Sequence, residues 1–316
     1  MLGLVPGNTT VELQARLDSA VGSASVSCTE EAARDLAAVG TAAERIAHRS
    51  RNSPERIAAH TIRVKALLAH ADVIWGRGQG ASAERELEEA IGDAKMLRRF
   101  DLVAMGLRLR ALTAAHLGQP VRATAFARAG LDALARTDPA MTAPIRASLL
   151  CEHARSEALT FASDRGRARA FADEAVSLAW ALPATGHGPI GHNYHGFNPY
   201  EAVYYRAVVA ALIADDDRYR ADAATFENWV GERGAYTNYL TSICLEGAAS
   251  QARRSDADGL LHSVEQAVRL TPTPVTANQL YRAERVIAAA RSSAMMTSKA
   301  AEARLILTGW IYDFQK

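Results

Sequence analysis

The feature that most constrains the fold is a recurrence of small residues at fixed spacing. The intervals are 12 and then 7 residues in two successive stretches, which contain Ala71, Ala83 and Ala90, and then Ala111, Ala123 and Gly130. Small side chains at such intervals allow two antiparallel helices to approach closely, and stacked pairs of this kind build a solenoid. The pattern therefore predicts an array of helix pairs in which each pair contacts its neighbours.

The composition agrees with an all-α array. A chain of 316 residues is longer than one ordinary hydrophobic core supports, and its 49% hydrophobic content excludes a disordered protein. Aromatic residues make up only 6%, and no run of alternating β-branched residues predicts a strand. We expect an all-α, right-handed superhelical solenoid of stacked antiparallel helix pairs, with about 12 to 14 helices.

Capping signals predict where the helices begin. Thr9 and Glu12 have the spacing of a capping box and open a helix to about Ser19, and Thr29 caps a second helix that ends near His48. Ser53-Pro54 then begins the regular part. Further helices are expected near 54–77, 82–97, 101–117, 120–136, 143–161, 165–182, 199–214, 218–231, 236–252 and 256–270. A last segment over 275–313 is expected to be interrupted near 292–298.

These elements divide the chain into three regions. Residues 1–52 are expected to form an N-terminal helical lead-in or cap, 53–272 the repeats, and 273–316 the C-terminal capping helices. The chain ends on an aromatic stretch, Trp310 to Phe314. Because an exposed final helix should be polar on its outer side, this stretch is expected either to fold back as a cap or to contact a partner.

The repeats resemble the tetratricopeptide (TPR) family, whose units carry small residues at their eighth, twentieth and twenty-seventh positions. Besides the two stretches above, these positions hold Ser156, Ala168 and Ala175 in a third unit and Ala248, Leu260 and Ala267 in the last. The unit around 204–230 aligns in more than one register and is left unassigned. The twentieth positions of the first three units lie 40 and 45 residues apart, against the usual ~34, so the helices or loops are longer than standard.

Arginine-rich and alanine-rich repeats of this kind also resemble the sensory regions of actinobacterial helix-turn-helix regulators. That resemblance implies a role in transcriptional regulation, with a DNA-binding head before the repeats. Only Leu36 and Gly40 faintly suggest such a head, so we expect it to be absent or encoded elsewhere. A net charge of +1 also argues against direct binding of nucleic acid by this chain.

The TPR resemblance implies that the first helix of each pair lines a concave groove. Mixed charge beside an aromatic side chain favours a peptide, a partner protein or a small effector as the ligand. An ordinary solvated helix face is the alternative. The expected groove residues are Lys65, Asp72, Trp75, Arg108, His153 and Glu157, extended by Tyr204, Tyr205 and Arg206.

A glycine-rich segment at 186–197 breaks the helical pattern and contains His187, His192 and His195. Histidine is a common metal ligand, so one hypothesis is a metal site completed by a further ligand from elsewhere. A lid that contacts the ligand and a plain connector are the other two hypotheses. No metal or other cofactor is predicted, and the three cysteines lack metal-binding spacing.

The sequence carries no recognisable catalytic motif. Glycine-rich phosphate loops, the HExxH pattern and the nucleophile elbow are all missing. The leading interpretation is a non-enzymatic interaction module. A metal-dependent enzyme built on the histidine segment and an oligomerisation scaffold, such as a homodimer, are the alternatives. No signal peptide or membrane-spanning stretch is evident, so a cytoplasmic protein without a membrane partner is expected.

Overall fold

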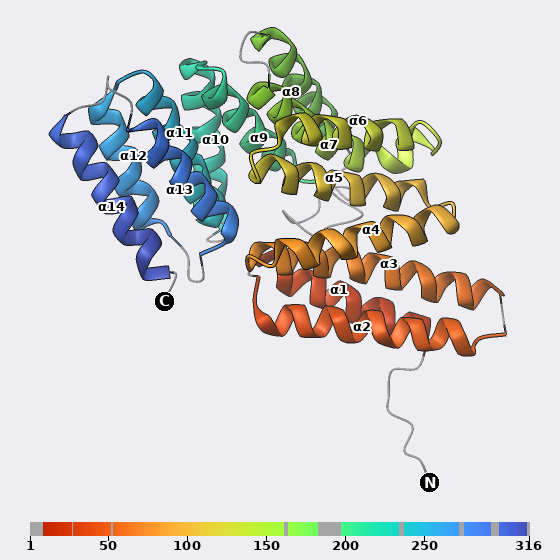
Figure 1. Cartoon of the computed structure of the whole chain (residues 1–316). Coiled ribbons are helices and arrows are strands. Elements are labelled where there is room, and N and C mark those ends of the chain that lie inside the picture. Colours follow the sequence, from red (N-terminus) through yellow and green to blue (C-terminus); the bar gives the residue numbers. More distant parts are fainter. Residues whose placement is uncertain are drawn as a thin grey trace.

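The structure is a computed structural model that describes residues 9–26, 28–51, 53–160, 164–182, 197–233, 237–271, 275–291 and 297–314. These residues form fourteen α-helices and no β-strand (Figure 1). The helices are α1 (Thr10–Val26), α2 (Glu30–Arg49), α3 (Ser53–Gly76), α4 (Gly80–Met96), α5 (Phe100–His116), α6 (Pro120–Leu134), α7 (Pro139–Thr160), α8 (Arg165–Trp180), α9 (Pro199–Leu212), α10 (Asp216–Arg233), α11 (Thr237–Arg253), α12 (Ala257–Arg269), α13 (Ala277–Ala289) and α14 (Ser298–Phe314). The all-α prediction is confirmed.

The expected helices are all present, and most of their ends agree to within a few residues. The first helix runs on to Val26 instead of ending near Ser19. The seventh begins at Pro139, because the Asp138 carboxylate accepts a hydrogen bond from the Ala140 amide (3.0 Å) and proline suits the first helical turn. Pro144, which is expected to mark a helix start, consequently lies inside this helix.

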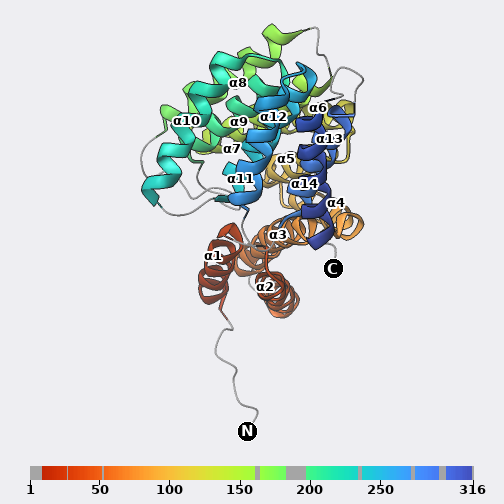
Figure 2. The same ribbon diagram turned by 90° about the vertical axis from the view of Figure 1, so that its left-hand side faces the viewer.

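The helices are arranged in two layers. Each odd-numbered helix packs against the next odd-numbered helix as well as against its even-numbered partner, from α1 through to α13. The odd helices therefore form a continuous inner layer, with the even helices outside them (Figures 1 and 2). An outer helix buries one stripe only, as α4 does with Ala83, Leu87, Ala90 and Ala94. Inner helices such as α5 and α9 are buried on most sides.

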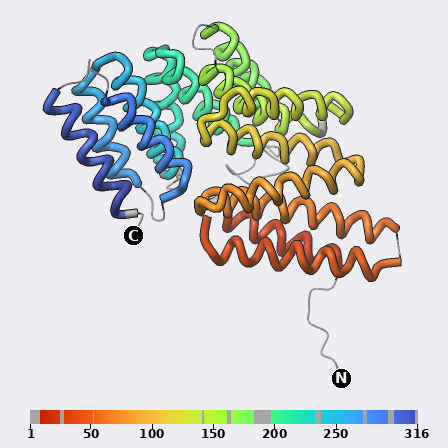
Figure 3. Tube along the Cα trace, in the orientation of Figure 1, coloured from red at the N-terminus to blue at the C-terminus, as the bar shows by residue number. Residues whose placement is uncertain are grey.

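The array curves until a late helix meets early ones. The chain passes from pair to pair in sequence order and bends, and α13 packs against α3 as well as against α11 (Figure 3). At this contact the Tyr281 hydroxyl donates a hydrogen bond to the carbonyl of Ala115 on α5, at 3.3 Å. The two residues are 166 positions apart in the chain. We call this meeting of α13 with α3 and α5 the closing contact.

The small residues lie where the helices approach most closely. All the positions named for the four repeat units are buried, and most have no exposed surface. At Gly130 a Cβ atom would lie 2.7 Å from Leu149 Cδ2, closer than carbon atoms pack. The predicted role of these residues in close helix packing is confirmed.

The C-terminal helix covers the end of the array. Trp310 is 7% exposed and packs in the core that α14 shares with α11 to α13, whereas Tyr312 is 59% exposed. Trp310 therefore packs within the chain, whereas Tyr312 lies on its surface. None of the helices in the described ranges is long and apolar enough to cross a lipid bilayer.

We predict that Gly130→Leu lowers the free energy of unfolding by roughly 1–3 kcal/mol, because the new side chain must displace Leu149. The matched control is Gly92→Leu, since Gly92 is exposed on α4 and a Cβ there meets nothing within 4 Å. Urea unfolding followed by circular dichroism measures both. A control as unstable as Gly130→Leu would contradict the assignment of Gly130 to a close helix contact.

Candidate functional site

Charged and hydrogen-bonding side chains from six inner helices gather in one buried region, which we call the inner polar cluster. All its charged members except Arg285 are at most 6% exposed, and the Arg285 side chain is 20% exposed. The members are Trp75 (α3), Arg108 and His116 (α5), Glu152 and Arg155 (α7), Glu201, Tyr204 and Tyr205 (α9), Glu246 (α11), and Arg282 and Arg285 (α13).

At one end of the cluster, Arg108 faces two carboxylates. Its Nη2 atom lies 3.5 Å from Glu201 Oε1 and 3.9 Å from Glu152 Oε1. The Tyr205 hydroxyl donates a short hydrogen bond to Glu152 Oε1. Burial, followed by the nearby Glu152 carboxylate, raises the pKa of Tyr205 well above its usual range. Tyr205 therefore stays protonated and acts as a permanent donor to Glu152.

At the other end, Glu246 is the acceptor for two arginines. Arg282 Nη1 donates to its carboxylate, and Arg285 Nη1 lies 3.2 Å from the same oxygen. Arg282 is held in place by a 2.9 Å bond from its Nε to Asn278 Oδ1. Burial alone would raise the pKa of Glu246, but the guanidinium groups of Arg285 and Arg282 lower it. Glu246 is therefore ionised, and this part of the cluster is a buried ion pair.

Arg155 lies between these two ion-paired ends and differs from both. Its side chain is 1% exposed, and its Nη1 atom is 3.7 Å from Glu152 Oε2. That separation is longer than a hydrogen bond. Within the described ranges, none of its three guanidinium nitrogens has a hydrogen-bond partner. Burying a guanidinium group without hydrogen bonds is costly, so Arg155 is the most unusual side chain of the site.

An aromatic stack connects the cluster to the closing contact. The His116 ring is stacked on Trp75, with centroids 6.3 Å apart, and meets Tyr281 edge-on at 5.9 Å. Burial lowers the pKa of His116 well below its usual range, and the charges of Arg155, Arg282 and Arg285 lower it further. His116 is therefore a neutral imidazole at physiological pH.

The structure brings some of the predicted groove residues together. Arg108, Tyr204, Tyr205 and Trp75 belong to the inner polar cluster, and Asp72 lies close enough to Arg108 to stabilise its charge. Lys65 is on the same helix as Asp72 and is 7% exposed. Burial, with a smaller effect from Arg99, lowers the pKa of Lys65.

The remaining predicted groove residues lie elsewhere. His153 stacks on Phe171 of α8 at 4.3 Å, and its Nε2 is 3.2 Å from Glu157 Oε1. This pair therefore faces the outer partner helix instead of Arg108. Arg206 also points away, since it pairs with Asp222 on α10 at 2.8 Å and with Asp173 on α8.

Sequence reasoning missed more than half of the charged residues of the cluster. These are Glu152, Arg155, Glu201, Glu246, Arg282 and Arg285. A usable signal exists for Glu246, which is the single charged residue in the otherwise uncharged stretch from 237 to 252. An isolated charge on a helix that is otherwise uncharged on all sides indicates a buried ion pair, because an inner helix offers it no route to water.

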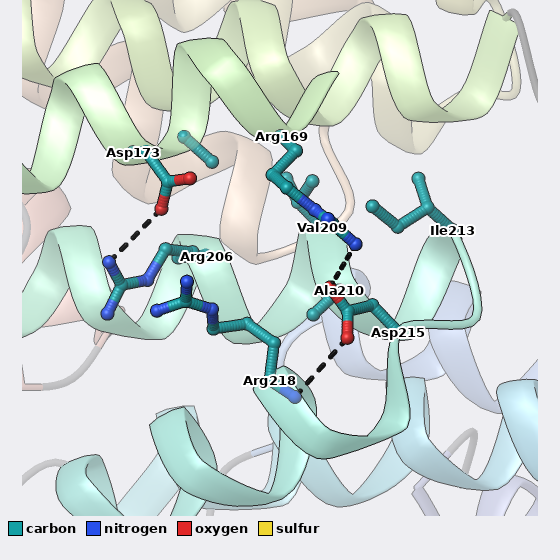
Figure 4. Close-up of a pocket in the computed structure, with 9 residues that line it drawn as sticks. Arg169, Asp173, Arg206, Val209, Ala210, Ile213, Asp215 and Arg218 are labelled. Atoms are coloured by element: carbon teal, nitrogen blue, oxygen red, sulfur yellow. Dashed lines mark hydrogen bonds and ion pairs between the residues drawn. The ribbon is translucent and has the colours of Figure 1, made fainter. Parts of the chain in front are cut away.

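A second candidate is a shallow surface pocket of about 10 Å³ between α8, α9 and α10 (Figure 4). Its charged groups largely pair with one another, Arg169 with Asp215 and Arg206 with Asp173. The floor is apolar. It is lined by Arg169, Ala172, Asp173, Arg206, Val209, Ala210, Ile213, Asp215 and Arg218. Because its ion pairs satisfy one another, this pocket points to a ligand less clearly than Arg155 does.

The predicted histidine segment, with His187, His192 and His195, lies outside the described residues. The lid, connector and metal hypotheses for it stay predictions. Within the part of the chain that the structure describes, no group of three or more histidine, cysteine, aspartate or glutamate side chains is placed to hold a metal ion.

Comparison with known proteins adds no family. No protein-family model matches the sequence, and no curated protein matches it. The resemblance to TPR repeats therefore rests on the small-residue positions, and the site rests on its own geometry.

We predict that Glu246→Leu lowers the free energy of unfolding by about 3–5 kcal/mol, because it leaves Arg282 and Arg285 without their shared carboxylate. The control Glu174→Leu removes an exposed pair with Arg146, whose atoms are 3.3 Å apart, and should cost less than about 1 kcal/mol. Urea unfolding at pH 7.5 compares the two. Equal losses would show that Glu246 does not hold a buried ion pair.

A second prediction concerns pH. The folded-state pKa of His116 lies below that of the unfolded chain, so the unfolded state binds the proton first as pH falls through about 6.5. The contribution of neutral His116 to the free energy of unfolding is therefore present above that pH and is lost as the pH falls below it. Between pH 7.5 and 5.5 the wild-type protein should lose about 1 kcal/mol more than His116→Phe, which keeps a ring between Trp75 and Tyr281.

Urea unfolding at the two pH values measures this difference. His153, whose pKa burial also lowers, titrates in both proteins, so the comparison isolates His116. Identical losses in the two proteins would mean that the pKa of His116 is the same in the folded and unfolded states.

Proposed function

We propose that this chain is a non-enzymatic, TPR-like binding module, a right-handed superhelix whose inner helices recognise a small effector. By its resemblance to the sensory regions of actinobacterial regulators, the module would act in transcriptional regulation through a DNA-binding partner or domain. A peptide or partner protein is the alternative ligand.

The observation that carries the proposal is the inner polar cluster itself. Six consecutive inner helices each contribute a polar or charged side chain to one buried region. Replacing a buried ion pair with apolar residues is often neutral or stabilising, so a helical scaffold does not need these charges to fold. Recognition of a ligand would explain why the cluster contains these buried charges, whereas a contribution to stability does not explain them.

The burial of the cluster favours a small effector over a peptide. Arg108, Glu152 and Glu201 are each at most 6% exposed. A peptide laid along a groove would be met by side chains that are exposed in the free protein, whereas small-molecule sites are largely enclosed.

The location of the cluster supplies a route from binding to regulation. Arg282 and Arg285 lie on α13, one and four residues after Tyr281, which makes the closing contact with α5. Arg108 and Arg155 approach from α5 and α7. A ligand that contacts both sides would favour the closed arrangement over a more open one, in proportion to its difference in affinity for the two.

A ligand screen tests the proposal. Thermal unfolding of the purified protein would be followed with amino acids, dicarboxylates, sugar phosphates, nucleotides and short peptides. We expect at least one class to raise the midpoint by a few degrees, because a ligand that binds only the folded state stabilises it. The charge-neutral variant Arg108→Met/Glu201→Gln should lose that response.

The control for the screen is Arg146→Met/Glu174→Gln, which removes an exposed ion pair of the same type and should respond as the wild type does. The absence of any response in the wild-type protein, or a response that survives in Arg108→Met/Glu201→Gln, would contradict binding at the inner polar cluster.

A further inference from the structure

The polar atoms of the inner polar cluster that lack a hydrogen-bond partner are mostly donors. Among the described residues, the unsatisfied donors are Nε, Nη1 and Nη2 of Arg155, Nε of Arg108, Nε1 of Trp75 and one ring nitrogen of neutral His116. The unsatisfied acceptors are Glu152 Oε2 and the other His116 nitrogen. An arginine side chain carries donors only, so this excess cannot be removed by rotating groups.

The carboxylates of the cluster do not correct the excess. Glu152 already accepts the Tyr205 hydroxyl, and its free oxygen is 3.7 Å from Arg155. Glu246 is shared by Arg282 and Arg285. What Arg155 lacks is an acceptor oxygen within hydrogen-bond distance.

The effect of nearby arginines on His116 indicates where an anion would be attracted. Arg155, Arg282 and Arg285 each act on the His116 ring strongly enough to lower its pKa. Guanidinium groups from α7 and α13 therefore act on one neutral ring next to Trp75 of α3, and their combined effect on it is that of a positive charge in spite of the Glu246 carboxylate that pairs with Arg282 and Arg285. These groups would attract an anion.

We propose that the inner polar cluster binds the anionic group of the effector, a carboxylate or a phosphoryl group, with Arg155 as its principal contact. This inference rests on the proposed function and names the chemical class of its ligand. The planar guanidinium fork matches two oxygens of either group, and such charge-assisted bonds are among the strongest in proteins. The anion would supply acceptor oxygens for Arg155.

The experiment titrates three probe anions, sulfate, inorganic phosphate and succinate, against thermal unfolding. Ionic strength is held constant with sodium chloride, and choline chloride serves as the cation probe. Sulfate and phosphate stabilise many proteins at high concentration by exclusion from the surface, so each probe is kept at or below about 10 mM. The response to succinate against that to phosphate separates the carboxylate from the phosphoryl ligand.

Three variants locate the response. Arg155→Met removes the charge, Arg155→Lys keeps the charge but removes the fork, and Arg146→Met removes an exposed arginine from the same helix. We expect the anion response in wild type and Arg146→Met, its loss in Arg155→Met, and at least tenfold weaker anion affinity in Arg155→Lys. Without anion, Arg155→Met should unfold at the wild-type temperature or above it, since it removes a buried guanidinium that makes no hydrogen bond and only a 3.7 Å ion pair with Glu152.

An equal anion response in wild type and Arg155→Met, or a wild-type response to choline alone, would overturn the proposal. So would an anion-free Arg155→Met that unfolds well below the wild type, because Arg155 would then be a structural residue satisfied by water. If the ligand screen yields only neutral or cationic ligands, the anion proposal fails while the binding function stands. If the screen yields no ligand, the binding function itself fails.

Discussion

The close approach of neighbouring helices is the constraint on which the rest of this structure depends. Ala71, Ala111 and Ala248 on three inner helices have no exposed surface, and a Cβ at Gly130 of the outer helix α6 would collide with Leu149 of α7. Such short contacts bring the inner helices near enough for long side chains from several of them to meet. The small residues between the helices therefore allow the close packing that brings the large polar residues of the inner polar cluster together.

The same geometry decides the charge state of the cluster. Because its side chains are removed from water, each group depends on the neighbours that the helices bring to it. Glu246 remains ionised between two arginines, Tyr205 remains protonated beside a carboxylate, and His116 remains neutral beside cations. Arg155 alone among the buried arginines of the cluster has no hydrogen-bond partner on any nitrogen in the described part of the chain.

Local signals were sufficient to predict the helices but not the site. Long periodic segments with Thr29 or Ser53-Pro54 at their starts define helices without tertiary information. Which face of α7 turns inward is a different matter, because consecutive residues point about 100° apart and the packing of the helix sets its rotation. Alignment to the repeat pattern selected His153, whereas its neighbour Glu152 faces Arg108. Arg282 and Arg285 were missed because their helix was assigned to the cap, and only the fold brings it back to α5.

The closing contact has a consequence for how such a chain can evolve. Open arrays of helix pairs change length readily, since an added or deleted pair leaves every other interface as it was. Here α13 must lie beside α3, with Tyr281 against Ala115. This placement depends on the number of helix pairs between α3 and α13. Duplication or loss of one helix pair would move α13 away from α3 and α5 and would break the closing contact. The number of helix pairs in this protein is therefore tied to the curvature of the array, and evolutionary change in such a chain should accumulate by substitution within pairs while the number of pairs stays constant.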